Sequence, residues 1–323
     1  MTGNSGQQTS ELLNLIKLKK MSESASYSIQ NNNQGSAKEL VQGVVGLISL
    51  PDVCVRVKEM VDDPECSAAD IGKVVSKDAA LTARLLRIVN SAFYQFPARI
   101  ETVSRAITIV GNRELKDLVF AATVAGIFEK VSSDLIDIET FWRHAVYCGI
   151  VSRIIAQKSG VLHSERLFVA GLMHDIGRMV IAYKLPNQCR DVLRYRKDND
   201  VDLHVAEQAI LGFDHAEVGA ELMKAWSLPQ SHQLAALHHH NPAKASEFVL
   251  EASIVYLANI ITELAEVGTD DVEVLKKVPD AIWQMTNIST ADIEDILVEA
   301  RDQFIDALTL IRTREGKSSH YVA

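Results

Sequence analysis

Histidines and one aspartate recur through the second half of this chain, at positions where the sequence predicts helices. Imidazole nitrogens and carboxylate oxygens are ligands for divalent transition metals, and together they fit Fe, Mn, Zn or Ni without selecting among them. A pocket that gathered these side chains would bind such a metal, which can activate water for phosphoester hydrolysis. The candidate ligands are His144, His174, Asp175, His215, His239 and His240.

Each candidate also has a purely structural interpretation. His144 and His174 lie on apolar stripes of predicted helices, and a single inward histidine is more often a hydrogen-bonded core residue. His239 and His240 end a predicted helix, where the helix dipole stabilises histidines that are simply solvated. Adjacent helical residues diverge by about 100°. A buried Asp175 beside His174 is therefore costly unless both border one site that holds a cation.

The elements that must position these residues are helical. From Ala37 onward apolar residues recur at spacings of three and four, and strand-like alternation is scarce, so the sequence predicts an all-α fold. Asp78 is a predicted N-cap, Gly111 a predicted left-handed C-terminal residue, and Asp214 with Glu217 a predicted capping box before His215. Further helices are expected over 138–159, 164–183, 214–226, 229–240, 247–267 and 291–312.

Composition limits the functional classes. The chain has 323 residues, 47% of them hydrophobic, and a formal net charge of −9, which describes a soluble globular protein and disfavours nucleic acid and anionic membranes as partners. The sequence predicts no export signal and no membrane span. The four cysteines are widely spaced without a Cys-x-x-Cys pair, which is typical of reduced thiols and indicates a cytoplasmic protein.

A helix, a glycine and a second helix around Gly111 also resemble a helix-turn-helix. Residues 38–130 nevertheless contain 12 Lys plus Arg and 12 Asp plus Glu, a net charge of zero. Nucleic-acid binding is therefore the less favoured alternative for this region.

Several sequence motifs follow one another in a fixed order along the chain. They include Leu50-Pro51, Asp78-Ala79-Ala80-Leu81-Thr82, Asn90-Ser91-Ala92-Phe93-Tyr94, Trp142-Arg143-His144, Ala170-Gly171-Leu172-Met173-His174-Asp175-Ile176-Gly177, Trp226-Ser227-Leu228-Pro229 and His239-His240-Asn241-Pro242. Together they resemble an HDOD domain, a signalling-associated branch of the HD phosphohydrolase superfamily that is related to the HD-GYP phosphodiesterases. The resemblance covers roughly residues 38–265 and implies a two-lobed helical HDOD domain with an HD-type helical bundle in the C-terminal lobe.

The expected organisation combines this resemblance with composition. We expect a disordered polar tail over 1–37, an N-terminal helical lobe over 38–130, an HD-type lobe over 131–265, a C-terminal helical extension over 266–313 and a flexible tail over 314–323.

By resemblance, His144, His174 and Asp175 form a first ligand set, and Asp175 can bridge two metals. His215, His239 and His240 would complete a second metal position. The superfamily's last ligand is an aspartate, where this chain has Asn259, and no Gly-Tyr-Pro follows His240. Arg178 replaces the lysine of active HD-GYP enzymes; it either holds a phosphate through its planar guanidinium or is an outward-facing helix residue.

Charge counting disfavours two metals, because one carboxylate and neutral imidazoles leave about three positive charges uncompensated in a pocket of low dielectric constant. A single metal held by His144, His174, Asp175 and the Asn259 carbonyl is easier to satisfy. The favoured interpretation is a regulatory HDOD protein that binds a signalling protein partner. The alternative is a metal-dependent phosphohydrolase, with Asp175 and Arg178 as catalytic candidates, acting on a nucleotide or cyclic dinucleotide.

Overall fold

A computed structural model describes residues 35–307 apart from 47, 49, 91–93, 95, 97, 129–133 and 269–272. Every regular element in these ranges is a helix, so the expected all-α class is confirmed. None of the described helices combines the length and apolar character needed to cross a membrane.

The first helices of the chain are α2 (Ala37–Gln42), α3 (Asp52–Asp62), α4 (Ala68–Val75), α5 (Ala79–Val89), α6 (Val103–Val110) and α7 (Asn112–Phe128). They are followed by α8 (Ile138–Lys158), α9 (Glu165–Met173), α10 (Ile176–Lys184), α11 (Pro186–Asn199), α12 (Leu203–Leu211), α13 (His215–Ala225), α14 (Gln230–His238) and α15 (Val249–Val267). The last are α16 (Asp280–Thr286) and α17 (Ile293–Ala307), and the short 3-10 turns are η1 (Pro242–Lys244), η2 (Leu275–Lys277) and η3 (Thr290–Asp292).

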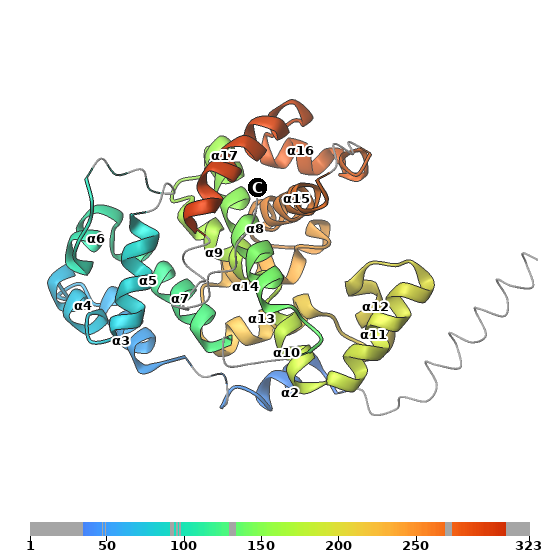
Figure 1. Ribbon diagram of the computed structural model, residues 1–323, viewed down its shortest axis with the longest axis horizontal. Coiled ribbons are helices and arrows are strands. Elements are labelled where there is room, and N and C mark those ends of the chain that lie inside the picture. The colour runs from blue at the N-terminus through green and yellow to red at the C-terminus, as the bar shows by residue number, and fades with distance from the viewer. Residues whose placement is uncertain are drawn as a thin grey trace, which may run out of the picture.

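The helices form two groups (Figure 1). Helices α3 to α6 lie together at one side, and α7 reaches the larger group, where it packs against α9. Helix α2 packs instead against α13 of the larger group, and nearby the Trp226 indole N–H donates a 2.9 Å hydrogen bond to the carbonyl oxygen of Ile48. One continuous apolar core joins both groups. The first described residues of the chain are thus part of the larger group.

Helix α8 is the centre of the larger group. Of its 21 residues, 14 are buried, and α9, α15 and α17 pack around it. A helix covered on nearly all sides loses the polar face that a surface helix keeps. His144 lies in the first half of α8, so its backbone is fixed by the helices that pack around α8.

Two expected N-caps are confirmed. The Asp78 carboxylate accepts a hydrogen bond from the backbone N–H of Leu81 (2.9 Å), and that of Asp214 accepts from Glu217 (3.0 Å). The Glu217 carboxylate accepts from the Gln208 side chain, so it ties α13 to α12 instead of closing a capping box. Gly111 has the expected positive φ of 96°, but its ψ of 161° is extended, because α7 begins at the next residue.

The prediction of a single helix over 164–183 is wrong. This segment forms two helices, α9 and α10, which are separated at His174 and Asp175. The backbone of Asp175 has φ −98° and ψ 5°. Helices α11 and α12 were not expected from the sequence, and α16 was expected only as part of the C-terminal helical extension over 266–313. In α11 only Val192 is buried, so this helix carries almost no apolar periodicity that a sequence pattern could reveal.

Several expectations lie outside the described residues. These are residues 1–34 of the polar N-terminal tail, the boundary between the two lobes at 130 and 131, the continuation of the last helix beyond 307 and the C-terminal tail over 314–323.

Asn90 closes the C-terminal end of α5. Its side-chain amide donates to the carbonyl oxygens of Leu86 and Ile100, and its amide oxygen accepts from the Ile100 N–H, each at 2.7 Å. Short polar side chains often satisfy backbone groups in this way. The structural role predicted for Asn90 is confirmed, whereas Ser91 lies outside the described residues.

Replacing Asn90 with Ala removes three hydrogen bonds to backbone groups, so we expect a loss of about 1–2 kcal/mol in the free energy of unfolding. Denaturant titration measures it. Asn199→Ala is the matched control, because Asn199 makes one exposed bond, to the Tyr195 carbonyl, and its loss should be smaller. Equal stability of the native protein and Asn90→Ala would remove the structural assignment.

Candidate metal centre

The break between α9 and α10 brings His174 and Asp175 to one site. The divergence of about 100° between neighbours within a helix does not apply across this break. Helix α10 then passes very close to α13, since a β-carbon at Gly177 would lie 2.0 Å from the carbonyl oxygen of His215. This contact, which only glycine allows, sets Asp175 beside His215.

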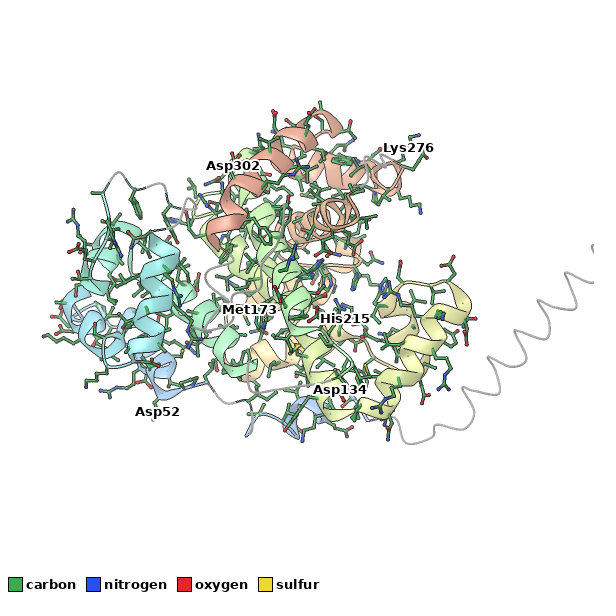
Figure 2. All side chains as sticks on the ribbon, viewed as in Figure 1. Asp52, Asp134, Met173, His215, Lys276 and Asp302 are labelled. Carbon is green, nitrogen blue, oxygen red and sulfur yellow. The ribbon has the colours of Figure 1, made fainter. Side chains whose placement is uncertain are left out.

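Oxygen Oδ1 of Asp175 is the centre of the site. It lies 3.1 Å from Nε2 of His215, 3.4 Å from Nε2 of His174 and 3.5 Å from Nε2 of His239. The Asp175 side chain is only 8% exposed. Residues far apart in the sequence thus converge on one buried carboxylate oxygen. In Figure 2, His215 lies between the central helices and the α11–α12 hairpin.

His174 and His239 each direct Nε2, a nitrogen that makes no hydrogen bond to any residue that the structure describes, toward this oxygen. Nδ1 of His174 is 2.7 Å from the carbonyl oxygen of Gly171, and Nδ1 of His239 is 2.6 Å from that of Ala236. A carbonyl only accepts, so each Nδ1 carries a proton, and in the neutral ring the lone pair is then on Nε2. Both Nε2 atoms are buried without a hydrogen-bond partner among the described residues. Burial lowers the pKa of His174 to about 3, which keeps it neutral.

His215 is held by a second buried carboxylate, that of Glu207 in α12. Glu207 accepts from the His215 backbone N–H (2.9 Å) and from its Nδ1 (2.5 Å), so Nε2 points toward Asp175. Burial by itself lowers the pKa of His215, but the charges of Glu207 and Asp175 outweigh it and raise that pKa to about 10. Without a metal, His215 is therefore a cation beside Asp175.

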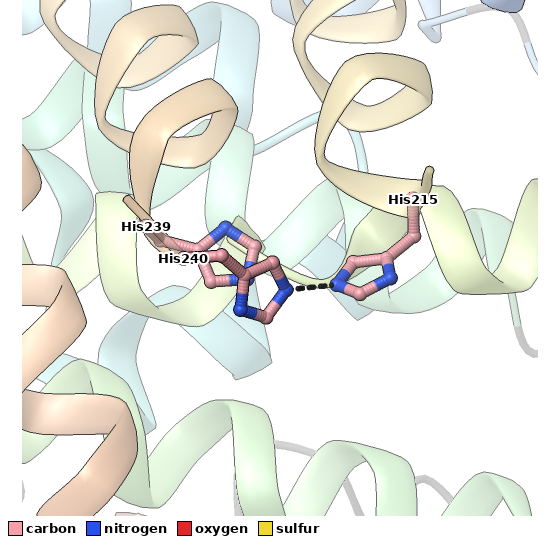
Figure 3. Close-up of side chains that lie close together, drawn as sticks. All are labelled: His215, His239 and His240. Atoms are coloured by element: carbon pink, nitrogen blue, oxygen red, sulfur yellow. Dashed lines mark hydrogen bonds between the residues drawn. The ribbon is translucent and has the colours of Figure 1, made fainter. Parts of the chain in front are cut away.

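His240 extends the cluster towards α12. Its Nε2 lies 2.8 Å from Nε2 of His215, as the dashed line in Figure 3 marks, and its ring stacks on His204 at a centroid distance of 4.0 Å. Burial and the neighbouring histidines lower the pKa of His240, so it stays neutral. His239 and His240 follow the end of α14 and reach the same cluster from one side.

His144 is bound at both ring nitrogens by α15. Nε2 lies 3.0 Å from the amide oxygen of Asn259, and Nδ1 lies 3.2 Å from both carboxylate oxygens of Glu266. The Asn259 amide nitrogen donates to Glu263 (3.1 Å), which turns its oxygen towards His144. Burial lowers the pKa of His144, but Glu266 and Asp175 raise it above its ordinary value. Its ring is 5.4 Å from that of His174 between centroids.

Arg178 occupies the second oxygen of Asp175. Its Nη1 donates to Oδ2 at 2.7 Å, while Oδ1 faces the histidines. Burial would raise the pKa of Asp175, but the positive charges of Arg178 and His215 hold it well below its ordinary range. Arg178 thus points to Asp175 and is not the freely outward-facing residue that was one alternative.

The donor set fits a divalent metal. Nε2 of His174 and Nε2 of His239 face Oδ1 of Asp175 at 3.4 and 3.5 Å and make no hydrogen bond there, so a bound cation would satisfy two buried atoms that otherwise have no partner in the described part of the chain. Two groups of side chains, His144 with His174 and Asp175, and His215 with His239 and His240, each place their ligand atoms within 4.8 Å of one another. The site therefore offers nitrogen and oxygen ligands of the kinds that Zn, Fe, Mn and Ni take.

Three carboxylates around the site were not anticipated from the sequence: Glu207, Glu263 and Glu266. The last two follow Asn259 at i+4 and i+7, the spacing of one helical face, so the sequence contained that signal. Glu207 had a weaker signal, an acid between the buried Ala206 and Ile210 of a helix that was not expected.

The sequence matches the HDOD domain family over residues 47–242, which is more than half of the chain. The chain belongs to the HDOD family. This membership confirms the resemblance drawn from the ordered motifs, and the helical architecture agrees with it.

Two solved structures have a fold similar to that of this chain. A protein of Shewanella amazonensis SB2B named "Putative phosphohydrolase" has a TM-score of 0.69 and 23% identity, covering 84% of this chain and 97% of its own. A protein of Marinobacter aquaeolei VT8 named "Putative signal transduction protein" has a TM-score of 0.64 and 20% identity, covering 89% and 68%. At these identities the similarity establishes the fold alone.

A curated relative, an uncharacterized protein of Treponema pallidum (strain Nichols), is 25% identical over 235 residues, 72% of this chain and 45% of the relative. The chain therefore spans about half the length of the curated relative that it matches.

Replacing Gly177 with Ala forces α10 away from α13, so we expect a loss of about 2–3 kcal/mol in the free energy of unfolding. Gly219→Ala is the control at the same contact, since a β-carbon there would be 3.5 Å from its nearest neighbour. That variant should be unchanged, or more stable by up to about 1 kcal/mol. If chemical denaturation shows equal effects for both, the close approach does not constrain the site.

Replacing Glu207 with Gln removes the charge that holds His215, and we expect divalent metal affinity to fall by roughly 10- to 100-fold, as for other partners of metal ligands. Zinc titration against a chelator measures it. Glu217→Gln, which alters an acid at a solvent-exposed contact of the same two helices, should bind as the native protein does. If Glu207→Gln binds zinc as tightly as the native protein does, Glu207 does not support metal binding through His215.

Proposed function

We propose that this chain is a regulatory HDOD protein that acts as an interaction or output module in signal transduction, with an HD pocket that holds at most one divalent metal and hydrolyses phosphoesters weakly or not at all. One observation carries the proposal. Asp175, the only acid among the candidate ligands, divides its two oxygens between the histidines and Arg178.

The residues that would hold the metal are His174, Asp175, His215 and His239, because the three Nε2 atoms lie 3.1–3.5 Å from one oxygen of Asp175. His215 would give up its Nε2 proton on binding a metal. His144 and Asn259 are hydrogen-bonded to each other, so they join only when that bond breaks. A bound divalent metal acts as a Lewis acid and activates water. Glu207 orients His215, and the fixed Nδ1 protons of His174 and His239 keep their Nε2 atoms available.

Bridging by Asp175, which would support a second metal, requires both of its oxygens. Oδ2 is bound by a guanidinium that is always charged. The second group, His215 with His239 and His240, consists of imidazoles alone and brings no negative charge to a metal unless Asp175 contributes. A two-metal centre of the phosphohydrolase kind is therefore disfavoured.

The regulatory role is supported by family membership and by the name of the Marinobacter relative. We propose a signalling protein as the partner, because a net charge of −9 disfavours nucleic acid. The four cysteines carry no disulfide, which agrees with a proposed place in the cytoplasm.

The alternative function is a metal-dependent phosphohydrolase that acts on a nucleotide or cyclic dinucleotide. The bare Nε2 atoms of His174 and His239 and the name of the Shewanella relative favour it. In that case Asp175 holds the metal and Arg178, whose side chain is 32% exposed, contacts a substrate phosphate.

Metal content and phosphoesterase rate should be measured together in the native protein, Asn259→Asp and Asp175→Ala. We expect Asn259→Asp to retain more metal, because a carboxylate there adds a negative charge beside Glu263 that a cation relieves. We expect Asp175→Ala to lose the metal. The control Asn187→Asp makes the same charge change on an exposed helix and should leave metal content unchanged.

The rate decides between the two functions. We expect negligible native turnover, and hydrolysis of a generic phosphoester to rise only in Asn259→Asp. Robust native turnover that disappears in Asp175→Ala would establish the enzyme instead. Absence of metal from all variants would leave the histidines as packed, hydrogen-bonded core residues.

A further inference from the structure

Arg178 is the charged residue that binds the second carboxylate oxygen of Asp175. Its guanidinium reaches back from the first turn of α10 to Asp175, three residues earlier, and Nη1 lies 2.7 Å from Oδ2. The carboxylate is 8% exposed and the guanidinium side chain 32% exposed. The ion pair therefore has one buried member and one member that solvent reaches.

This pair changes the charge of the ligand set. The candidate ligands other than Asp175 are imidazoles and an amide, so Asp175 supplies their only negative charge. Arg178 cancels that charge permanently, since a guanidinium does not deprotonate in proteins. A divalent cation that approaches Oδ1 meets a neutralised carboxylate and a fixed positive charge on its far side.

We infer that Arg178 is an internal cation that competes with a divalent metal for Asp175 and thereby limits both the affinity and the number of metals in this pocket. The inference rests on the proposed single-metal pocket and names the residue that restricts it. Arg178 is in this sense a specificity-determining residue of the metal site.

A purely structural role of Arg178 has the opposite consequence. Asp175 is the N-cap residue of α10 and its side chain makes no capping bond to the backbone, so Arg178 would serve to hold this carboxylate in place. Removing a positioning residue of a metal ligand weakens metal binding. Removing a competing cation strengthens it. The sign of the change in affinity therefore separates the two roles.

The experiment is a titration with zinc ion against a chromophoric chelator, together with metal analysis of the equilibrated protein. The variants are Arg178→Gln and Arg178→Met, which both remove the charge, and Arg178→Lys, which keeps it. Arg194→Gln is the matched control, because Arg194 pairs with Asp191 at the same three-residue spacing on the exposed side of α11. Thermal unfolding with and without zinc gives a second readout.

We expect Arg178→Gln and Arg178→Met to bind zinc on the order of 10- to 100-fold more tightly than the native protein, the size of effect usual for partners of metal ligands. Zinc should also raise their Tm by more. Arg178→Lys and Arg194→Gln should bind as the native protein does. Use of two neutral variants keeps the test decisive if one of them does not fold.

The failures are distinguishable. If the native protein binds one zinc ion and neither neutral variant binds it more tightly, the competition is disproved while the single-metal pocket stands. If neutral variants bind zinc and the native protein does not, the competition is supported and the occupied native pocket is disproved. If no variant binds zinc, both proposals are wrong.

Discussion

The buried carboxylate of Asp175 is the constraint around which this site is built. An ionised carboxylate removed from water is strongly destabilising unless cations or hydrogen-bond donors compensate it. Here Arg178 binds one oxygen, and three imidazoles surround the other. The helix break at His174 and the glycine contact of α10 with α13 both serve this arrangement, because they bring the compensating groups within reach.

Around this inner set lies an outer ring of carboxylates. Glu207 holds His215, Glu266 holds His144, and Glu263 holds the amide of Asn259. A charge count restricted to the ligands therefore underestimates the negative charge available to a metal, and the same count omits the positive charge of Arg178. The Asn259 amide stands where the superfamily has an aspartate ligand, and it has a structural role of its own. It accepts a hydrogen bond from His144 and donates one to Glu263, and so fixes the orientation of both side chains.

No candidate ligand comes from α2 to α7, yet these helices share one apolar core with the larger group of helices. Helix α13 connects the two regions physically. It carries His215 at its first residue and packs against α2, and Trp226 at its C-terminal end binds the backbone of Ile48. A change at His215 and a change in the N-terminal segment would thus act on the same helix.

By itself the sequence determined the helical class, the N-caps at Asp78 and Asp214, the role of Asn90 and the family, because each depends on local spacing or on ordered motifs. It also named the histidines and Asp175. It did not determine that His174 and Asp175 lie between two helices, that Arg178 binds Asp175, or that Glu207 reaches His215. Those features depend on contacts between helices, above all the approach at Gly177, and charge compensation in a buried site is decided only where residues distant in the chain meet.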